Sequence, residues 1–493
     1  MKRLSLVLVV FGLLALGGQS FAELCTVDAV PAATLLVPYF EVGDGVTTLF
    51  SINNASAAPT IAHVIFWTDW SFPTIDFDIY LTGYDVATVN VADVFEGIIP
   101  LSADPPNDPF DANATCGVNV QGVPGEHSSP CGGVNSVNPH WDNVIGGPAG
   151  GFPFCQNIFP NFNNPVITGT ALTRLVNGHS GQVVPLPVNN CVGDDHGDGH
   201  FRGYVTIDNA SQCSLVLQPG FPGYFQTGGT GIANNINQLW GDWFLVDTVN
   251  NFAQGDTLVH IEANSNFDAA QIPLLDPDTG VTVTTVANAT GYTFYGRYFA
   301  PPTGPDNREP LGTIWGTRYL NGGVFDQTQL VVWRDSTSSE GAQIPPPANQ
   351  SWCGGVGPTW FPLNETEVIA FNEAEDAVEI CFFTGGFVSP PDESDPPCFP
   401  WETHLYNWGD GDLSVPFNFG WAWLNLNLPP DAPDGDADFG TDGNIAQSHV
   451  TTMHSALGLF SVGLQAVQLY DACQDYNQFL NGAIENGGVN IID

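Results

Sequence analysis

Two short acidic segments contain residues whose types and spacing could bind a metal ion. In the first segment, carboxylates occupy positions 1, 3, 5 and 9, as Asp434, Asp436, Asp438 and Asp442. Oxygen ligands at this spacing could surround one Ca²⁺. The segment departs from the EF-hand loop, because Phe439 stands at the position of the required glycine and Ile445 at that of the bidentate glutamate. Two interpretations therefore stay open, a calcium site and a solvated polar loop.

The second segment combines carboxylates with imidazoles over seven residues. Its donors are separated by glycines, and we take four of them as candidate ligands: Asp194, His196, Asp198 and His200. Mixed nitrogen and oxygen donors suit a transition metal such as Zn²⁺, with an open position for water. No helical spacing places the two histidines on one face, so an acidic, solvated loop is the alternative.

Aromatic and acidic residues raise the question of carbohydrate chemistry. Thirteen tryptophans are many for 493 residues. Most of them, Trp421 included, lie in alternating apolar runs and are expected in cores. Trp360 and Trp408 lie among glycines and prolines and are the candidates for a sugar-binding face. Asp76 and Asp78 share a strand face that we expect to be solvated, at a separation of about 7 Å, near that of glycosidase carboxylates.

Composition excludes several classes of chemistry. The chain has eight basic and 52 acidic residues and a formal net charge of −44. Its one lysine, Lys2, lies in a segment that we expect to be removed. A lysine Schiff base, a phosphate-loop lysine and a basic surface for nucleic acid are therefore excluded. We expect no nucleic-acid partner and no nucleotide or organic cofactor, and Ca²⁺ is the cofactor that the leading hypothesis includes.

The N-terminus has the pattern of an export signal. A basic start at Lys2 and Arg3 precedes an apolar run from Leu4 to Leu16, and Ser20 and Ala22 supply small residues at a cleavage site. Residues 1–22 are therefore expected to be a signal peptide. The expected location is secreted, extracellular or at the cell surface, with the periplasm as an alternative. No later run is apolar enough for a transmembrane segment.

All ten cysteines follow this signal. An even number in an exported chain without a C-x-x-C pair favours disulfide bonds over a metal site. The spacing leaves the pairing open. The cysteines are Cys25, Cys116, Cys131, Cys155, Cys191, Cys213, Cys353, Cys381, Cys398 and Cys473.

Short alternating runs separated by Gly, Pro, Asn and Asp predict an all-β protein of antiparallel β-sandwich modules, Ig-like or jelly-roll-like, with little helix. Expected strands in the first half cover residues 34–42, 47–53, 60–67, 74–81, 86–94, 169–176 and 203–208. Those in the second half cover residues 243–249, 257–263, 281–286, 292–299, 329–333, 368–371, 378–383 and 415–428, with a pair over 451–470. The alternation changes phase near Gly420, which predicts a bulge there.

We expect two modules after the signal peptide. The first spans residues 23–222 and contains a loop-rich, cysteine-containing insertion over about residues 102–165, too long for a hairpin loop. The second, larger β-rich domain spans residues 223–493, and the glycine-rich stretch from Pro219 to Gly231 marks the boundary.

No motif identifies a reaction. The leading hypothesis is a secreted, disulfide-stabilised extracellular or cell-surface β-protein with a structural, adhesive or ligand-binding role, stabilised by Ca²⁺ and associating with itself, surface polymers or glycans. The alternative is a secreted carbohydrate-binding protein or glycoside hydrolase. A third interpretation attributes the acidity to a saline habitat alone. An enzymatic role is thus left open, with a non-enzymatic one favoured.

Overall fold

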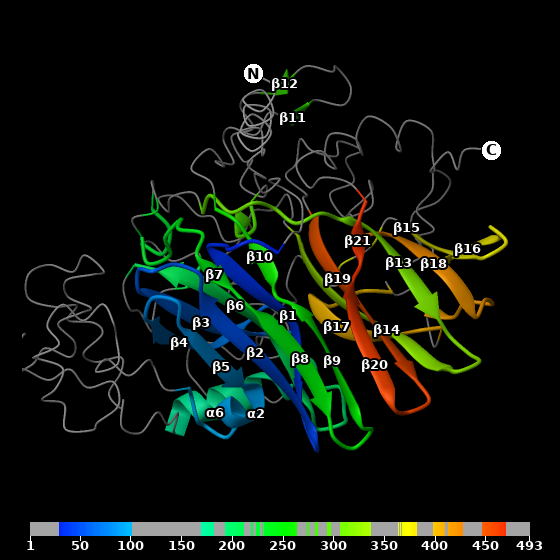
Figure 1. Ribbon diagram of the computed structural model, residues 1–493, viewed down its shortest axis with the longest axis horizontal. Helices are drawn as coiled ribbons and strands as arrows, with labels where there is room; N and C mark the ends of the chain where they lie inside the picture. Colours follow the sequence, from blue (N-terminus) through cyan, green and yellow to red (C-terminus); the bar gives the residue numbers. More distant parts are fainter. Residues whose placement is uncertain are drawn as a thin grey trace, which may run out of the picture.

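The computed structural model shows an antiparallel, mostly β protein with two short helices in its described part (Figure 1). The described residues are 29–100, 169–181, 193–211, 218–219, 223–226, 229, 231–263, 274–275, 282–283, 293–296, 306–336, 363, 365, 367–381, 398–409, 413–426 and 446–469. The expected signal peptide and the insertion at 102–165 lie outside them.

Two sheets form the N-terminal half. The β1 sheet has the order β10 (Val259–Ile261), β1 (Thr34–Val42), β6 (Phe201–Ala210), β3 (Thr60–Thr68) and β4 (Pro73–Leu81). The β2 sheet has the order β5 (Val86–Asn90), β2 (Val46–Asn54), β8 (Asp242–Asp247) and β9 (Phe252–Thr257), with β7 (Leu239–Trp240) also on β2.

Two further sheets form the C-terminal half. The β14 sheet has the order β17 (Thr403–Trp408), β14 (Phe325–Ser336), β19 (Ala446–Ala456) and β20 (Phe460–Gln465). The β18 sheet has the order β16 (Ala377–Cys381), β15 (Glu367–Asn372), β18 (Phe419–Asn425), β13 (Ile314–Leu320) and β21 (Val467–Gln468). A separate ribbon pairs β11 (Leu274–Leu275) with β12 (Thr282–Val283).

The described residues form three hydrophobic cores, of which one lies between the two sheets of each half. The third covers the other face of the β1 sheet. Val64 of β3 and Ile207 of β6 share a core with Phe50 of β2 and Trp243 of β8. In the C-terminal half the core joins residues of the β14 and β18 sheets, among them Leu330, Val332, Ala370, Leu424 and Val450. Val331 and Met453 belong instead to the N-terminal core, because alternate residues of a strand face opposite sides. The β14 sheet therefore contributes to the cores of both halves.

Two segments expected as strands are helical. Residues 169–176 lie in helix α6 (Gly169–Gly178), where Leu172, Leu175 and Val176 repeat at helical spacing and pack against the N-terminal core. That spacing outweighs the β-branched residues of the segment. The strand expected over 86–94 ends at Asn90, whose side chain accepts a hydrogen bond from the Ala92 amide and caps helix α2 (Val91–Phe95).

Three further local expectations are wrong. Described residues 293–296 form a turn and not a strand. The pairing of β18 with β13 and β15 passes Gly420 without a register shift, so no bulge lies there. Gly420 is required by close packing, because a Cβ at this position would meet the Phe371 carbonyl. The unbroken register places Trp421 on the outer face of the β18 sheet, with 43% of its surface exposed, and Leu424 in the core.

The hairpin expected around residues 372–376 is confirmed, since β15 and β16 pair on either side of it. The N-terminal strand pairing, however, continues past the expected boundary at 222/223. β8 pairs with β2, and β10 pairs with β1. Residues 242–261 thus belong to the sheets of the first half. Trp243 and Leu245 pack in the core between these sheets, whereas Val259 and Ile261 pack in the core on the other face of the β1 sheet.

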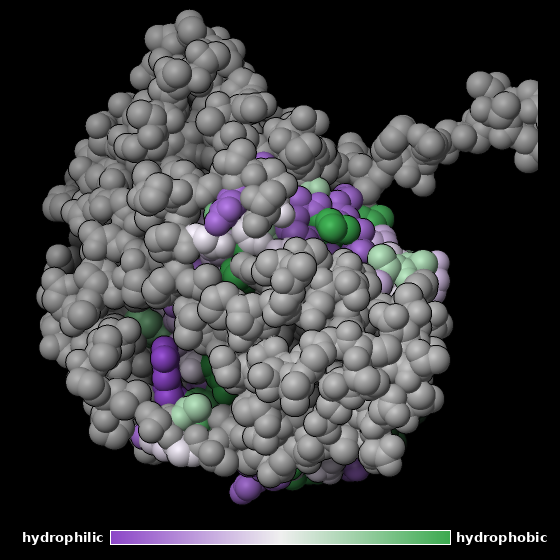
Figure 2. Space-filling model, turned by 90° about the vertical axis from the view of Figure 1, so that its left-hand side faces the viewer, coloured by the Kyte–Doolittle hydropathy of each residue, from purple (hydrophilic) through white to green (hydrophobic). Residues whose placement is uncertain are grey.

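Figure 2 shows the face of the molecule at the left of Figure 1. The described side chains that reach the surface there mix hydrophilic and hydrophobic types. In the part of the chain that the structure describes, no helix is long and apolar enough to cross a membrane.

Candidate functional site

The acidic segment that contains His196 and His200 is a described loop that leads into β6. Gly197 and Gly199 adopt positive φ angles of 74° and 78°, which favour glycine and let the chain turn twice. The amide of Gly197 donates to Asp195 Oδ1, and the amide of His200 donates to Asp198 Oδ1, each over 3.0 Å. These short side-chain turns fix the directions in which the loop's donors point.

His200 and Asp198 meet two residues of the β1 sheet. His200 Nδ1 lies 2.6 Å from Glu41 Oε1, and Tyr39 donates its hydroxyl hydrogen to Glu41 Oε2 over 2.7 Å. Arg202 Nη2 contacts Glu41 Oε1 at 2.8 Å and Asp198 Oδ2 at 2.5 Å. Glu41 and Arg202 are register partners on β1 and β6, so strand pairing sets this geometry. We call Glu41, Asp198, His200 and Arg202 the open cluster, since Asp198 is exposed.

The open cluster could hold a metal ion. One ligand atom from each of Glu41, Asp198 and His200 lies within 4.8 Å of the others. Arg202 already supplies positive charge to both carboxylates, and its hydrogen bonds hold the pKa of Asp198 well below its ordinary value. Burial alone would lower the pKa of Arg202, but its hydrogen bond to Asp198 and the charge of Glu41 raise it. A metal ion would therefore compete with a firmly held guanidinium.

His196 and Asp194 lie in a different set of contacts. His196 Nε2 lies 2.7 Å from Asp69 Oδ2, and the Asp194 amide donates to Asp69 Oδ1 over 3.0 Å. The Trp401 indole donates to Asp194 Oδ2 over 3.0 Å. The His196 ring stacks on His404, with ring centroids 5.0 Å apart. The four predicted ligands thus divide into two pairs, of which only Asp198 and His200 belong to the group that could hold a metal.

Burial and the neighbouring charges shift the pKa values of these groups. Burial raises the pKa of Asp69, although its hydrogen bond to His196 opposes the shift. Burial would lower the pKa of His196, but the hydrogen bond and charge of Asp69 raise it. The pKa of His404 is lowered to about 3 by burial, with further contributions from His196 and Arg202. His404 is therefore neutral and His196 is the more basic ring of the stack.

Glu41 and Asp69 were not predicted from the sequence. Glu41 lies 159 positions from His200 and Asp69 lies 127 from His196, so no local motif connects them. The one available signal was Glu41 itself, a carboxylate within an otherwise uncharged nine-residue strand.

The other candidate residues have different outcomes. Trp408 is wrong as a ligand-binding residue, because it is 1% exposed and packs in the C-terminal core beside Tyr319. Alternate residues of β17, Tyr406 and Trp408, face that core. Trp360 lies outside the described residues, as do Asp434, Asp436, Asp438 and Asp442.

The cysteines lie mainly outside the described part of the chain. Cys398 is disulfide-bonded, and no free cysteine is found among the described residues. Cys381 ends β16. The remaining eight cysteines fall outside, so their pairing stays a prediction: Cys25, Cys116, Cys131, Cys155, Cys191, Cys213, Cys353 and Cys473.

A second polar cluster crosses the β1 sheet in one row of register partners. The row runs from Asp78 on β4 through His63 on β3 and Asp208 on β6 to Thr34 on β1. His63 Nδ1 lies 2.7 Å from Asp78 Oδ1, with both side chains fully buried. The expectation that Asp76 and Asp78 lie on a solvated face is therefore wrong for Asp78, because the connections after β6 and β10 cover this face of the sheet.

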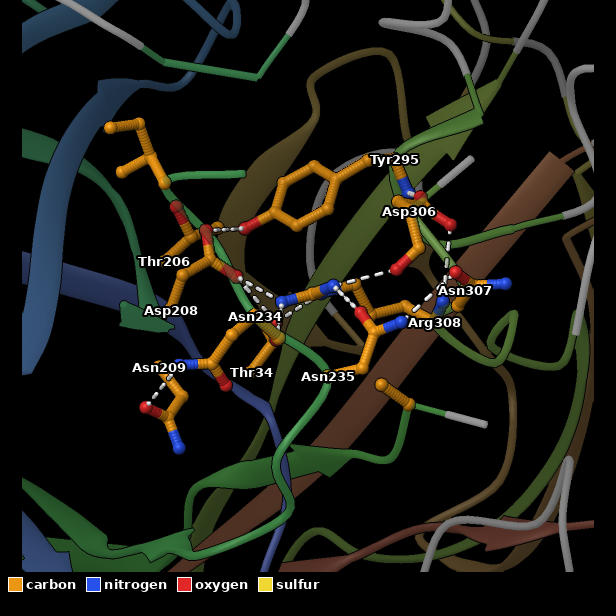
Figure 3. A network of polar contacts seen from close by, with 12 residues as sticks. Thr34, Thr206, Asp208, Asn209, Asn234, Asn235, Tyr295, Asp306, Asn307 and Arg308 are labelled. Carbon is orange, nitrogen blue, oxygen red and sulfur yellow. Dashed lines mark hydrogen bonds and ion pairs between the residues drawn. The ribbon is translucent and has the colours of Figure 1, made fainter. Parts of the chain in front are cut away.

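Arg308 extends this row at Thr34 and Asp208, and we call Asp78, His63, Asp208, Thr34 and Arg308 the buried row. Figure 3 shows the end of the row at Arg308. Its guanidinium donates to Thr34 Oγ1 over 2.8 Å and lies 3.5 Å from Asp208 Oδ1. Tyr224 and Tyr295 donate their hydroxyl hydrogens to Asp208 Oδ2 over 2.5 and 2.9 Å. Both carboxylate oxygens of Asp208 therefore have hydrogen-bond partners inside the protein, as a buried charge requires.

The buried row also shifts pKa values. Burial would lower the pKa of His63, but the charge and hydrogen bond of Asp78 raise it to about 9. Burial raises the pKa of the adjacent Asp76 to about 6. His63 is thus a buried cation at neutral pH, paired with the Asp78 carboxylate.

Comparisons with known proteins found no match: no family model, no curated protein and no solved structure is similar to this chain. The function is therefore argued from the residues and their geometry.

Proposed function

We propose that this chain is a secreted extracellular or cell-surface β-protein with a structural, adhesive or ligand-binding role, in which the open cluster binds a divalent transition metal such as Zn²⁺. The signal-like N-terminus and ten cysteines support the compartment. Two pairs of antiparallel sheets, each around a shared core, support β-sandwich modules. A scaffold of this kind provides rigid positions for loop ligands.

The observation that carries the proposal is the convergence of Glu41, Asp198 and His200. One imidazole and two carboxylates suit Zn²⁺ better than Ca²⁺, which prefers oxygen ligands alone. Tyr39 orients Glu41 through the second carboxylate oxygen, as metal ligands generally require.

Metal binding in the open cluster is an exchange of cations. In the metal-free protein Arg202 compensates the charges of Glu41 and Asp198. A metal ion must displace at least part of these contacts. Its affinity therefore depends on the free energy lost when the guanidinium gives up its bonds to the two carboxylates. Since a metal-bound imidazole must be neutral, protons also compete with the metal.

The test is calorimetric titration of the mature, oxidised protein with Zn²⁺ and, separately, with Ca²⁺. We expect one Zn²⁺ per chain, with affinity lost in His200→Asn. The matched control is His196→Asn, which removes the other imidazole of the same loop but not a member of the open cluster. Equal loss in both variants, or no Zn²⁺ binding by the unaltered protein, would overturn the metal assignment.

Calcium binding at Asp434, Asp436, Asp438 and Asp442 stays a separate proposal, since these residues lie outside the described part. Heat of Ca²⁺ binding that Asp436→Asn removes and His200→Asn leaves intact would support it.

A second candidate function, carbohydrate binding or hydrolysis, is favoured by the outer face of the β18 sheet. Phe371 and Trp421 are register partners whose rings stack with centroids 4.5 Å apart. Glu367 shares this face, and burial together with the neighbouring Glu379 raises its pKa to about 7. Exposed aromatic surface next to a carboxyl group that is protonated near neutral pH is suited to sugar contacts and to acid catalysis.

A glycan array and a reducing-sugar assay test this second function. We expect Trp421→Ala to abolish glycan binding and Glu367→Gln to abolish only hydrolysis. The buried Trp408→Phe serves as a tryptophan control that leaves the outer face intact. An array without bound glycans, together with no turnover, would reject the candidate.

A further inference from the structure

The hairpin of β19 and β20 is unusual in a chain of this charge. Residues 443–470 contain no Asp, Glu, Lys or Arg, although the chain has 52 acidic residues. The exposed side of β20 is apolar, with Phe460 65%, Val462 47% and Leu464 52% exposed. Because these residues alternate along the strand, they form one continuous row. We call them the β20 row.

The apolar surface continues past both ends of β20. Leu457 and Leu459 in the β19–β20 turn and Val467 on β21 are also exposed. Leu457 has a φ of 58°, a conformation that leucine rarely adopts. Its amide donates to the Val324 carbonyl over 3.1 Å, so the turn is anchored to the neighbouring β13–β14 turn. The row therefore belongs to an ordered, anchored hairpin.

The side of β20 opposite the β20 row is covered by β9. β20 pairs with β19 on one side and lies against β9 on the other, as Figure 1 shows. Ser461 Oγ donates to the Ala253 carbonyl over 2.5 Å and accepts from the Ala253 amide over 3.3 Å. The β20 row is therefore the side of this strand that stays open to a partner.

We propose that the β20 row is the contact through which two copies of this chain associate. Interface centres are depleted of charged residues, and the row has none. Two chains with a net charge of −44 repel each other wherever their carboxylates face each other. A surface without charged residues is therefore where two copies approach with the least electrostatic repulsion. A straight row of alternating apolar residues is also self-complementary under a two-fold axis.

Charge argues against the other occupants. A basic protein would be attracted to the acidic surfaces and not to this one, and an anionic lipid surface would repel the chain. The apolar residues also extend along the side of β20 and not only at the hairpin tip, which is less suited to insertion of the tip into a lipid layer.

The experiment is sedimentation equilibrium of the mature, oxidised protein over a range of concentrations, in EDTA and at high salt, where repulsion is screened. We expect a monomer–dimer equilibrium whose dissociation constant rises at least about tenfold in Val462→Asp, a change of ~1.4 kcal/mol. Val86→Asp is the matched control, since Val86 is an exposed valine (59%) on β5. Leu459→Ser repeats the test in the turn if Val462→Asp does not fold.

Three results would overturn the proposal. The protein could remain monomeric at every concentration. A dimer could form that Val462→Asp and Leu459→Ser leave unchanged. A monomeric protein could bind phosphatidylcholine vesicles through the same residues, which would assign the row to lipid.

Discussion

The two ends of the β1–β6 strand pair carry similar groups in different surroundings. At one end, Thr34 pairs with Asp208 in the buried row; at the other, Glu41 pairs with Arg202 in the open cluster. Both ends join an arginine and a histidine to two carboxylates. In the buried row Arg308 and Asp208 are fully buried, whereas in the open cluster the Asp198 side chain is 44% exposed.

This difference in exposure distinguishes charged groups that only stabilise the fold from charged groups whose partner can be exchanged. A buried ion pair cannot replace a lost partner with water, so its members are fixed by one another. A partly exposed pair loses little when a partner leaves, because solvent and ions compensate. The buried row is therefore suited to fixing the strands, and the open cluster to exchanging one cation for another.

The largest expected effect is on the buried row. Arg308→Met should lower the free energy of unfolding by about 3–5 kcal/mol, because it leaves Asp208 charged and buried. Denaturant unfolding of the oxidised protein measures this. A loss below about 1 kcal/mol would mean that the buried row does not fix the strands as described.

The pH dependence of stability should also come from the buried row. The folded pKa of His63, about 9, lies above its ordinary value of 6.5. Its stabilisation is therefore complete below pH 6.5 and is lost as the pH rises toward 9. Asp76, with a folded pKa of about 6 against 3.8, acts in the same direction between pH 4 and 6.

Unfolding measured from about pH 7.5 to 9 should thus show falling stability that His63→Gln flattens, because the buried histidines with a lowered pKa, such as His260 and His404, change stability only below this range. His260→Gln is the control, because burial lowers the pKa of His260 to about 4 and places its titration outside this window. A slope unchanged by His63→Gln would contradict the charge assigned to His63.

A smaller effect is expected when the open cluster loses its own cation. Arg202→Gln should tighten Zn²⁺ binding by roughly tenfold, or ~1.4 kcal/mol, since the metal no longer competes with the guanidinium. Calorimetric titration of this variant beside the unaltered protein measures the change. Weaker binding in the variant would show that Arg202 holds the ligands in place and does not compete.

The smallest effect should follow Asp198→Asn in the absence of metal. Because Asp198 is exposed, its ion pair with Arg202 should contribute less than about 1 kcal/mol to folding. The same variant should nevertheless lose Zn²⁺ binding. A stability loss as large as that of Arg308→Met would remove the distinction between the two clusters.

The sequence predicted strands well where alternation reflects one buried face. The runs at β1 to β4 and the β15–β16 hairpin are confirmed within a few residues. Trp421 was expected in a core because it lies in an alternating run, and Trp408 outside because glycines and prolines surround it. Both expectations were wrong, because neither pattern indicates which face is buried. Helix α6 was missed although Leu172, Leu175 and Val176 repeat at helical spacing, because only these few residues give the helical signal.

Two of the three candidate metal ligands could be predicted from the sequence. Asp198 and His200 stand close together in a loop rich in metal-binding donors, and this local concentration identified them. Glu41 could not be paired with them, because its position depends on the register of β1 with β6. The buried row had no local signal at all, since its members come from four strands and from the connection that holds Arg308.

The most direct test of the central distinction is thermal unfolding of the oxidised protein with and without excess Zn²⁺, in unaltered, His200→Asn and His63→Gln chains. A ligand that binds only the folded state raises its stability, by ~2.7 kcal/mol at a hundredfold excess over the dissociation constant. We expect this gain in the unaltered and His63→Gln proteins and none in His200→Asn. Stabilisation by Zn²⁺ that persists in His200→Asn, or that vanishes in His63→Gln, would contradict this distinction between the two clusters.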